Sequence, residues 1–491
     1  MNMKLLFSAI VVGLCMTGPA ASEALPDIHR GVYAIWTKPG AADGLPFISG
    51  GQVHMVWQTV QPAPDRYDFT EMRAALEKVA ALGRYATVQI NGNLHPAFLF
   101  DRVPHHPAQF SIQTRDKQGT LQYWHPVYVK AYTDLIAAYA RELKASPLRS
   151  RIAGIRLNFN ALGTEHMDIP EAERGAEHWV VPSGVAPAPA WTPQIAAAYR
   201  KTIVDAFIRN FSPGMPVFLR AGVVHESNTP PEIVQMVSAG KLGLFITGSE
   251  IEPRPAMANG WSPIFLEYCR TGKTICYAES WADAWGRHST KRDPRWCGPE
   301  QYTYWRVLSD LNLGVSMIAV YGNDLEKAND PEFRAAFDFA ARYAGYHASP
   351  SKSPGAWVAL REGNVLKGDY TFLMKRRPGP MMRGEQEAGP AGQRFGAWAR
   401  KLAKGDRVEF DLDPAFAASL AGRKAAVRVT YLDIGQGQLT LTASGHVFRS
   451  ALTGSGKWKT AEFEIGSASF SGPIALVGDT ELTLHMVEVR R

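Results

Sequence analysis

Short apolar runs and longer amphipathic runs alternate along the chain from Gly31 to Gly345. In the amphipathic runs the apolar positions recur at steps of three and four, as at Phe69, Met72 and Leu76, which predicts helices. The apolar runs have strand length and lie at 31–36, 52–58, 85–91, 152–159, 216–221, 242–247, 274–279 and 314–321. The helical segments are 69–83, 126–144, 193–211, 229–239, 299–311 and 331–345. Strands separated by helices in this way predict a parallel (β/α)₈ TIM barrel.

One segment departs from this rhythm. Residues 37–50 show no helical stripe, so we expect a loop in place of the first barrel helix. A doubly wound open sheet is the alternative α/β fold. That fold usually carries a glycine-rich phosphate turn after its first strand, and the sequence has none there.

The pattern changes after His347. Residues 349–355 are rich in serine and proline and predict a linker, followed by short alternating runs such as 425–432, 438–443 and 481–489. Alternation of this kind predicts strands of an all-β sandwich of jelly-roll type. Residues 376–396 are interpreted as a long mobile loop. The expected domains are therefore a barrel over 23–348 and a β-sandwich over 349–491.

The N-terminal residues 1–22 have the pattern of a signal peptide. Lys4 is followed by an apolar stretch and by Ala20-Ala21-Ser22, the small residues that a signal peptidase needs. Cys15 allows a lipid anchor as the alternative, although Leu14 before it is bulky. We therefore expect a secreted or periplasmic protein. No later stretch is long and apolar enough for membrane insertion to be expected.

Charge and cysteine content narrow the function classes. The net charge of +7 is spread along the chain without a basic arm or an aromatic-basic repeat, so no nucleic-acid partner is expected. Cys269, Cys276 and Cys297 follow the predicted leader and allow at most one internal disulfide, but we interpret them as small buried residues. The sequence has no zinc-ligand spacing, no H-E-x-x-H pattern, no esterase elbow and no complete P-loop, so we expect no metal and no cofactor.

Polar residues gather where the predicted strands end. In the fourth strand Arg156, Asn158 and Asn160 share one phase, and Glu165 follows in a turn with Gly163. The seventh strand ends at Glu279. Because the carboxyl ends of barrel strands meet at the functional mouth, we expect Glu165 and Glu279 to lie there together.

Two glutamates at a barrel mouth are suited to glycoside cleavage, in which one carboxyl protonates the leaving oxygen and the other attacks carbon or activates water. Aromatic rings stack on sugars, and amides and imidazoles bind hydroxyl groups. Glu250 and Glu252, after the sixth strand, are rivals for the second carboxylate. The predicted substrate-binding residues are Trp36, Trp57, Gln89, Asn91, His95, Asn160, Glu250, Trp281 and Tyr321.

A short motif supports this interpretation. Residues 56–62 (VWQTVQP), followed by Tyr67-Asp68-Phe69, resemble the W-x-x-x-(Q/E)-P…Y-D-F signature of β-galactosidase-like and related barrel glycosidases. The resemblance implies a retaining enzyme with Glu165 as acid/base and Glu279 as nucleophile. That clan has an asparagine directly before its acid/base, whereas Asn160 stands five residues before Glu165. It often has tryptophan at the end of strand eight, where this chain has Tyr321.

The sequence therefore predicts a glycoside hydrolase that acts on an extracellular or periplasmic oligo- or polysaccharide. Inverting hydrolysis or transglycosylation on the same barrel is one alternative. A catalytically silent carbohydrate-binding protein of the cell envelope is another, because barrels support many activities.

Overall fold

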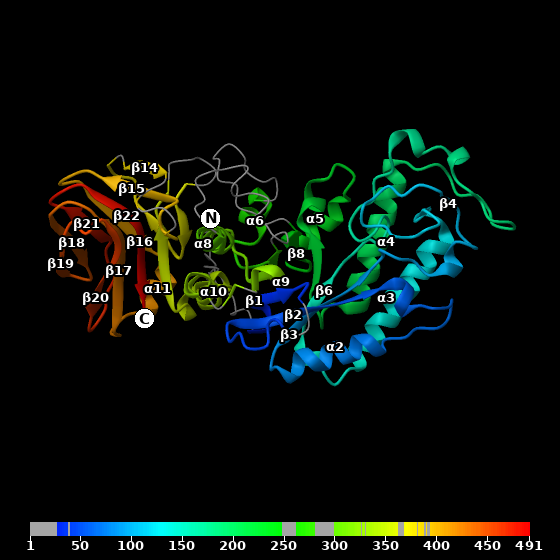
Figure 1. Ribbon diagram of the computed structural model, residues 1–491, viewed down its shortest axis with the longest axis horizontal. Coiled ribbons are helices and arrows are strands. Elements are labelled where there is room, and N and C mark those ends of the chain that lie inside the picture. Colours follow the sequence, from blue (N-terminus) through cyan, green and yellow to red (C-terminus); the bar gives the residue numbers. More distant parts are fainter. Residues whose placement is uncertain are drawn as a thin grey trace, which may run out of the picture.

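The computed structural model describes residues 27–37, 40–247, 262–279, 299–325, 327–328, 330–361, 368–380, 382–386, 389 and 393–491. A barrel and a β-sandwich lie side by side along the long axis of the molecule (Figure 1). The predicted signal peptide, residues 1–22, lies outside the described residues. Among the described residues, no helix is long and apolar enough to cross a membrane.

Eight parallel strands form a closed barrel in the order β1-β10-β9-β8-β7-β6-β3-β2. Closure excludes the open doubly wound sheet. All eight runs predicted from the sequence contain a barrel strand, although β2 begins four residues earlier and β6 ends three residues earlier than predicted. The strands are β1 (Gly31–Ile35), β2 (Ile48–Val56), β3 (Tyr85–Asn91), β6 (Ile152–Arg156), β7 (Val217–Arg220), β8 (Gly243–Thr247), β9 (Cys276–Glu279) and β10 (Met317–Tyr321).

Helices connect these strands and cover the barrel. The described residues between β1 and β2 form turns instead of a helix, which confirms the expected loop there. Three short helices, α1, α6 and α9, were not predicted, because none of them is long enough to show a repeating apolar stripe. The helices are α1 (Trp57–Val60), α2 (Thr70–Ala81), α3 (Pro126–Ala145), α4 (Pro193–Phe211), α5 (Pro231–Ser238), α6 (Ser262–Tyr268), α8 (Pro299–Asn312), α9 (Gly322–Leu325) and α10 (Pro331–Tyr343).

The long connections after β3 and β6 project from the barrel. A two-stranded hairpin, β4 (His105–His106) with β5 (Thr120–Leu121), lies in the first of them. The backbone of His105 pairs with Val180 and so ties the two connections together. Single turns of 3₁₀ helix occur at η1 (Asp27–His29), η2 (Ala97–Leu99), η3 (Arg149–Arg151), η4 (Glu171–Glu173), η5 (Ala176–His178), η6 (Ala221–His225), η7 (Tyr346–Ala348) and η8 (Pro350–Lys352).

The interior of the barrel changes from apolar to polar along its axis. Its apolar filling is a compact cluster of buried side chains contributed by six strands: Tyr33, Ile35, Ala153, Phe218, Phe245, Tyr277, Met317 and Ala319. Because side chains alternate along a strand, the residue two positions after Tyr277 on β9 also points inward, and that residue is Glu279. The apolar layer thus forms the floor on which the polar site rests.

The β-sandwich consists of two antiparallel sheets, as predicted. Strands fall within all three sequence runs named above. The predicted mobile loop 376–396 is wrong in part, because β14 lies within it and pairs with β15. One sheet contains β11 (Gly355–Ala359), β12 (Tyr370–Phe372), β14 (Arg383–Gln386), β15 (Trp398–Leu402), β17 (Ala425–Asp433), β20 (Lys457–Ile465) and β22 (Leu482–Arg490). The other contains β13 (Met374–Arg376), β16 (Arg407–Leu412), β18 (Gly437–Ala443), β19 (His446–Leu452) and β21 (Ile474–Gly478). A short helix, α11 (Pro414–Ser419), follows β16.

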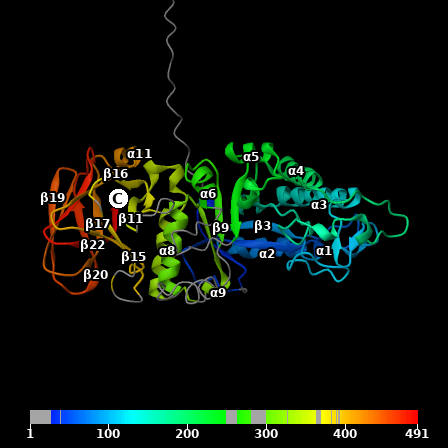
Figure 2. The same cartoon turned by 90° about the horizontal axis from the view of Figure 1, so that it is seen from above.

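The seven-stranded sheet has hydrophobic cores on both faces. On β11, Ala356 and Val358 belong to the core between the two sheets, whereas Trp357 and Ala359 belong to the core of the barrel. Figures 1 and 2 show α8 between the barrel strands and this sheet. The expected linker 349–355 is therefore a fixed connection with buried residues, not a flexible spacer.

A disulfide joins Cys269, directly after α6, to Cys276 at the start of β9. Our interpretation of both cysteines as merely small buried residues is therefore wrong. Spacing alone could not pair them, because the two chain positions are brought together by the helix-to-strand turn. Cys297 lies outside the described residues.

Candidate active site

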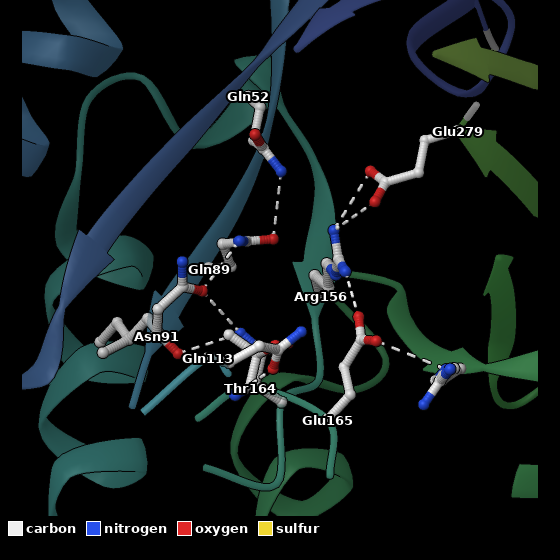
Figure 3. A network of polar contacts seen from close by, with 11 residues as sticks. Gln52, Gln89, Asn91, Gln113, Arg156, Thr164, Glu165 and Glu279 are labelled. Atoms are coloured by element: carbon white, nitrogen blue, oxygen red, sulfur yellow. Dashed lines mark hydrogen bonds and ion pairs between the residues drawn. The ribbon is translucent and has the colours of Figure 1, made fainter. Parts of the chain in front are cut away.

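Glu165 and Glu279 meet at the carboxyl end of the barrel, where Arg156 binds both (Figure 3). Arg156 is the last residue of β6, and its guanidinium donates from Nη1 to Glu279 at 3.2 and 3.3 Å. Its Nη2 donates to Glu165 Oε1. The side chains of all three residues are buried, with 7%, 5% and 2% exposure for Arg156, Glu165 and Glu279. The sequence placed both carboxylates at this mouth, and the structure brings them onto one cation.

Burial and charge act against each other on Glu279. Burial raises the pKa of Glu279 to about 7, because a carboxylate is poorly solvated inside the protein. The positive charge of Arg156 opposes this rise, and the negative charge of Glu165 adds to it. Burial also opposes the charge on Arg156, but the two carboxylates outweigh it and raise the pKa of Arg156. Glu279 can therefore change its protonation state near neutral pH.

A tight turn after β6 positions Glu165. Asn160 adopts a left-handed conformation (φ +52°), which asparagine tolerates better than most residues. Its Oδ1 accepts from the Gly92 amide at 2.8 Å, and its Nδ2 donates to the Ile90 carbonyl at 3.1 Å. The Asn160 side chain thus fastens the turn to β3. Since Asn160 is fully buried, it supports the site instead of contacting substrate as predicted.

The same turn passes close to the long connection after β3. Gly163 has φ +90°, and a Cβ atom there would lie 2.4 Å from Cβ of Gln113. Gln113 Oε1 accepts from the amide and hydroxyl of Thr164 at 3.0 and 2.6 Å. Glycine is thus required at 163, and Thr164 is held directly before Glu165.

A row of amide side chains faces the carboxylates from β2 and β3 (Figure 3). Gln52 donates to Gln89 at 3.2 Å, Gln89 donates to Asn91 at 2.8 Å, and Asn158 donates to the same Asn91 oxygen at 2.9 Å. Gln89 and Asn91 are buried and Gln52 is half-buried. Gln52 was not predicted. It lies on β2 two residues before His54, and because side chains alternate along a strand, Gln52 and His54 point to the same face.

Trp36 lies open at the mouth, whereas Trp57 does not. Trp36 follows β1, is 39% exposed, and has its ring 4.5 Å from that of His54. Trp57 is fully buried against Tyr132 and donates from Nε1 to Gln61 at 2.7 Å. The prediction that Trp57 binds substrate is therefore wrong in this structure, since its ring is core packing. Trp57 and Gln61, two residues of the W-x-x-x-(Q/E)-P motif, are therefore hydrogen-bonded to each other inside the protein.

His95 is also buried, and its ring contacts other side chains of the protein. Its Nδ1 lies 2.6 Å from Asp116 Oδ2, and its Nε2 lies 2.9 Å from the Tyr128 hydroxyl. Because His95 is buried and bonded at both nitrogens, it does not face a substrate as predicted. Tyr321 ends β10 half-buried beside the apolar floor. The predicted ligands Glu250 and Trp281, and the rival Glu252, lie outside the described residues.

A pocket of about 380 Å³ adjoins Glu165. Arg220, the last residue of β7, lines this pocket with a 30% exposed side chain, and its Nε lies 3.4 Å from Glu165 Oε2. Arg220 was not predicted. The signal that could have found it is its position, because Arg220 is the last residue of β7, just as Arg156 is the last residue of β6 and Glu279 the last of β9. The remaining lining residues are Phe110, Ser111, Ile112, His166, Met167, Asp168, Arg200 and Glu226.

One group of side chains has the composition of a metal site. His106, Glu173 and His178 place ligand atoms within 4.8 Å of one another on the projecting connections. However, His106 Nδ1 accepts from the Ala108 amide at 3.0 Å, which places the proton of a neutral ring on Nε2. That Nε2 lies 3.1 Å from Glu173, so it is set to donate to the carboxylate and not to bind a metal.

Comparison with known proteins gives remote likenesses. No known protein family and no curated protein matches the sequence. The catalytic domain of a β-amylase from Paenibacillus polymyxa is similar at 11% identity and a TM-score of 0.42, over 64% of this chain and 99% of that one. A GH5_18 protein from Bifidobacterium longum subsp. infantis is similar at 13% identity and a TM-score of 0.40, over 64% and 79%. The C-terminal CBM6 of a Zobellia galactanivorans laminarinase is similar at 8% identity and a TM-score of 0.18, over 24% and 99%.

Proposed function

We propose that this protein is an exported glycoside hydrolase, with Glu279 as nucleophile and Glu165 as acid/base. The observation that carries the proposal is that two buried glutamates at the mouth of the barrel bind one guanidinium. Because both reach Arg156, they are close enough to act on one glycosidic bond. The exposed ring of Trp36 supplies a surface for a sugar face.

In this mechanism, the Glu279 carboxylate attacks the anomeric carbon while Glu165 gives its proton to the leaving oxygen. Glu165 then removes a proton from water, the water attacks the same carbon, and the bond to Glu279 breaks. Arg156 helps to keep Glu279 ionised against the effect of burial. The amide row from Gln52 to Asn91 lies opposite, where sugar hydroxyl groups require donors and acceptors.

The disulfide between Cys269 and Cys276 supports the proposed location. Structural disulfides persist outside the cytoplasm and are rare within it. This agrees with the leader pattern of residues 1–22 and with a saccharide outside the cytoplasm as substrate.

The test is hydrolysis of a panel of aryl glycosides and polysaccharides by the wild type, Glu279→Ala and Glu165→Ala, with and without azide. We expect Glu279→Ala to be inactive without azide and to form a glycosyl azide of inverted anomeric configuration when azide is added. Asp168→Ala is the matched control, because it removes an exposed carboxylate from the pocket beside Glu165 and leaves Arg156 untouched. Wild-type turnover in both glutamate variants would refute the assignment.

A saccharide-binding protein without turnover is the second candidate. It is favoured by the position of Arg156, because a guanidinium bound to two buried carboxylates is also a stable structural ion triad. This candidate predicts saccharide binding that survives Glu279→Ala and no hydrolysis by the wild type on any member of the panel.

A further inference from the structure

The hydrogen bonds of the amide row at the mouth all run in one direction, which a backbone carbonyl determines. Asn158 Nδ2 lies 3.1 Å from the carbonyl oxygen of Ile90. A carbonyl oxygen can only accept a hydrogen bond, so the Asn158 atom that faces it must be the nitrogen. The same Nδ2 lies 2.9 Å from Asn91, and the Asn91 atom that it meets must therefore be the oxygen Oδ1. The carbonyl of Ile90 thus fixes the orientation of two amide groups.

This orientation determines those of Gln89 and Gln52 in turn. Because Asn91 Oδ1 is an acceptor, the Gln89 atom 2.8 Å from it must be the donor Nε2. The other end of the Gln89 amide is then its oxygen, which accepts from Gln52 Nε2 at 3.2 Å (Figure 3). Gln52 therefore ends the row, and its oxygen Oε1 takes no part in it.

Two acceptor oxygens of the row lack a hydrogen-bond donor. Gln52 Oε1 and Asn158 Oδ1 are both shielded from water, and neither accepts a hydrogen bond from any residue that the structure describes. A buried oxygen without a donor costs free energy, and a ligand that donates to it removes this cost. Asn158 is fully buried, whereas Gln52 is half-buried on β2. Gln52 is therefore the residue that borders the open part of the mouth.

The hydroxyl groups of a neutral sugar suit an acceptor at this position. A hydroxyl group can donate to Gln52 Oε1 and still accept a hydrogen bond from another group. A carboxylate offers acceptors alone, so a carboxylate that faced Gln52 Oε1 would leave two acceptors without a proton between them. Arg156 already binds the carboxylates of Glu165 and Glu279. The row thus favours a neutral saccharide over an acidic one.

We propose that Gln52 determines which sugars bind at the mouth, because its Oε1 accepts a hydrogen bond from a hydroxyl group of a neutral sugar and disfavours an acidic sugar. That this sugar is also the substrate rests on the proposed function. Its binding does not require turnover, so binding and hydrolysis can be tested separately.

Calorimetric titration tests this inference with the neutral trisaccharides cellotriose, laminaritriose, mannotriose and xylotriose, and with a galacturonic acid trisaccharide. The protein carries Glu279→Gln, so that no ligand is hydrolysed. We expect at least one neutral trisaccharide to bind, and the acidic trisaccharide to bind at least about tenfold more weakly than that one. Gln52→Leu in the same background should weaken neutral binding about tenfold or more, because it removes the acceptor.

A second variant, Gln52→Lys, separates the acceptor from the rest of the side chain. Lysine can still donate to Gln89, but it presents only donors to a ligand. We expect Gln52→Lys to bind the neutral trisaccharide about tenfold more weakly than the protein with Gln52, and to bind the acidic trisaccharide more tightly. Gln235→Leu, the same change on the exposed face of α5, is the control and should leave affinity unchanged. Circular dichroism checks that each variant is folded.

The outcomes separate this inference from the proposed function. Unchanged neutral binding by folded Gln52→Leu protein would overturn the inference, as would a preference for the acidic trisaccharide in the protein with Gln52, or no binding of any neutral trisaccharide at about 10 mM. Hydrolysis of the same ligands is measured with the wild type. If neutral binding depends on Gln52 and the wild type hydrolyses no ligand, the proposed function fails and the inference stands. If the wild type hydrolyses a ligand whose binding is independent of Gln52, the inference alone fails.

Discussion

Replacing Glu279 with glutamine should stabilise the fold at alkaline pH while abolishing activity. Burial raises the pKa of Glu279 from 4.5 to about 7 in the folded protein. A carboxyl with a raised folded-state pKa binds its proton more tightly when the chain is folded. Its contribution to stability is thus complete below pH 4.5 and is lost as the pH rises through 7.

The size of this effect follows from the two pKa values. At about 1.4 kcal/mol per pKa unit, the ionised Glu279 costs about 3 kcal/mol of unfolding free energy at alkaline pH. Glutamine carries no charge, and its amide oxygen can still accept a hydrogen bond from Arg156. For a chain of 491 residues that unfolds as one unit, this free energy corresponds to a Tm increase of about 3 °C.

Scanning calorimetry of the wild type and Glu279→Gln, at about pH 8.5 and about pH 4, measures this difference. We expect the variant to melt higher at the alkaline pH and the gap to vanish at the acidic pH, where the wild-type carboxyl is protonated in both states. Glu464→Gln, on the exposed face of β20, is the control for removing a carboxylate that stays in water. A Tm for Glu279→Gln at or below the wild-type Tm at about pH 8.5 would show that Arg156 outweighs burial, and the reasoning would fail.

Four other outcomes follow from the same structure. In the wild type, kcat/KM should fall as the pH drops through about 7, because the nucleophile Glu279 must be ionised. Arg156→Met should move this fall in the pH profile of kcat/KM to higher pH, because the substitution removes the positive charge that lowers the pKa of Glu279. Gly163→Ala should lower kcat at least tenfold by displacing the turn that carries Glu165, which steady-state kinetics would detect, with Gly184→Ala, whose surroundings are open, as the control. Trp305→Ala should cost about 3–5 kcal/mol in urea unfolding and give one coincident transition by far- and near-ultraviolet circular dichroism, whereas two separated transitions would show that barrel and sandwich unfold independently. Cys269→Ser should lower the unfolding free energy by about 2 kcal/mol through loss of the disulfide, and an unchanged value would mean that the bond is not formed.

The barrel could be predicted because its strands are buried on both faces. Such strands appear in a sequence as continuous apolar runs, and all eight were located even though their ends were not. Glu279 and Glu165 could be placed at the mouth because strand ends converge there. The phase of Arg156 was also visible in the sequence.

The partners of these residues could not be predicted. Arg156 joins β6 to a residue of β9, and no pattern along one strand specifies a contact between strands that are not neighbours in the barrel. Trp36 and Trp57 both follow strand ends, yet one is exposed and the other buried, because the chain continues as a loop after Trp36 and as a helix from Trp57. The two-sided burial of β11 was equally hidden, since it depends on packing against α10.

The sheet with two cores has a consequence for how this protein changes over evolutionary time. Trp357 and its neighbours on β11 contribute alternately to the barrel and to the sandwich, so a substitution on α10 alters the surroundings of a strand that also builds the second core. Residue pairs across this boundary are therefore expected to covary among homologues. Recombination at 349–355 would leave Trp305 and Phe339 against an unmatched surface, which makes the sandwich a poor candidate for exchange between proteins. We therefore expect the barrel and the sandwich to be inherited together.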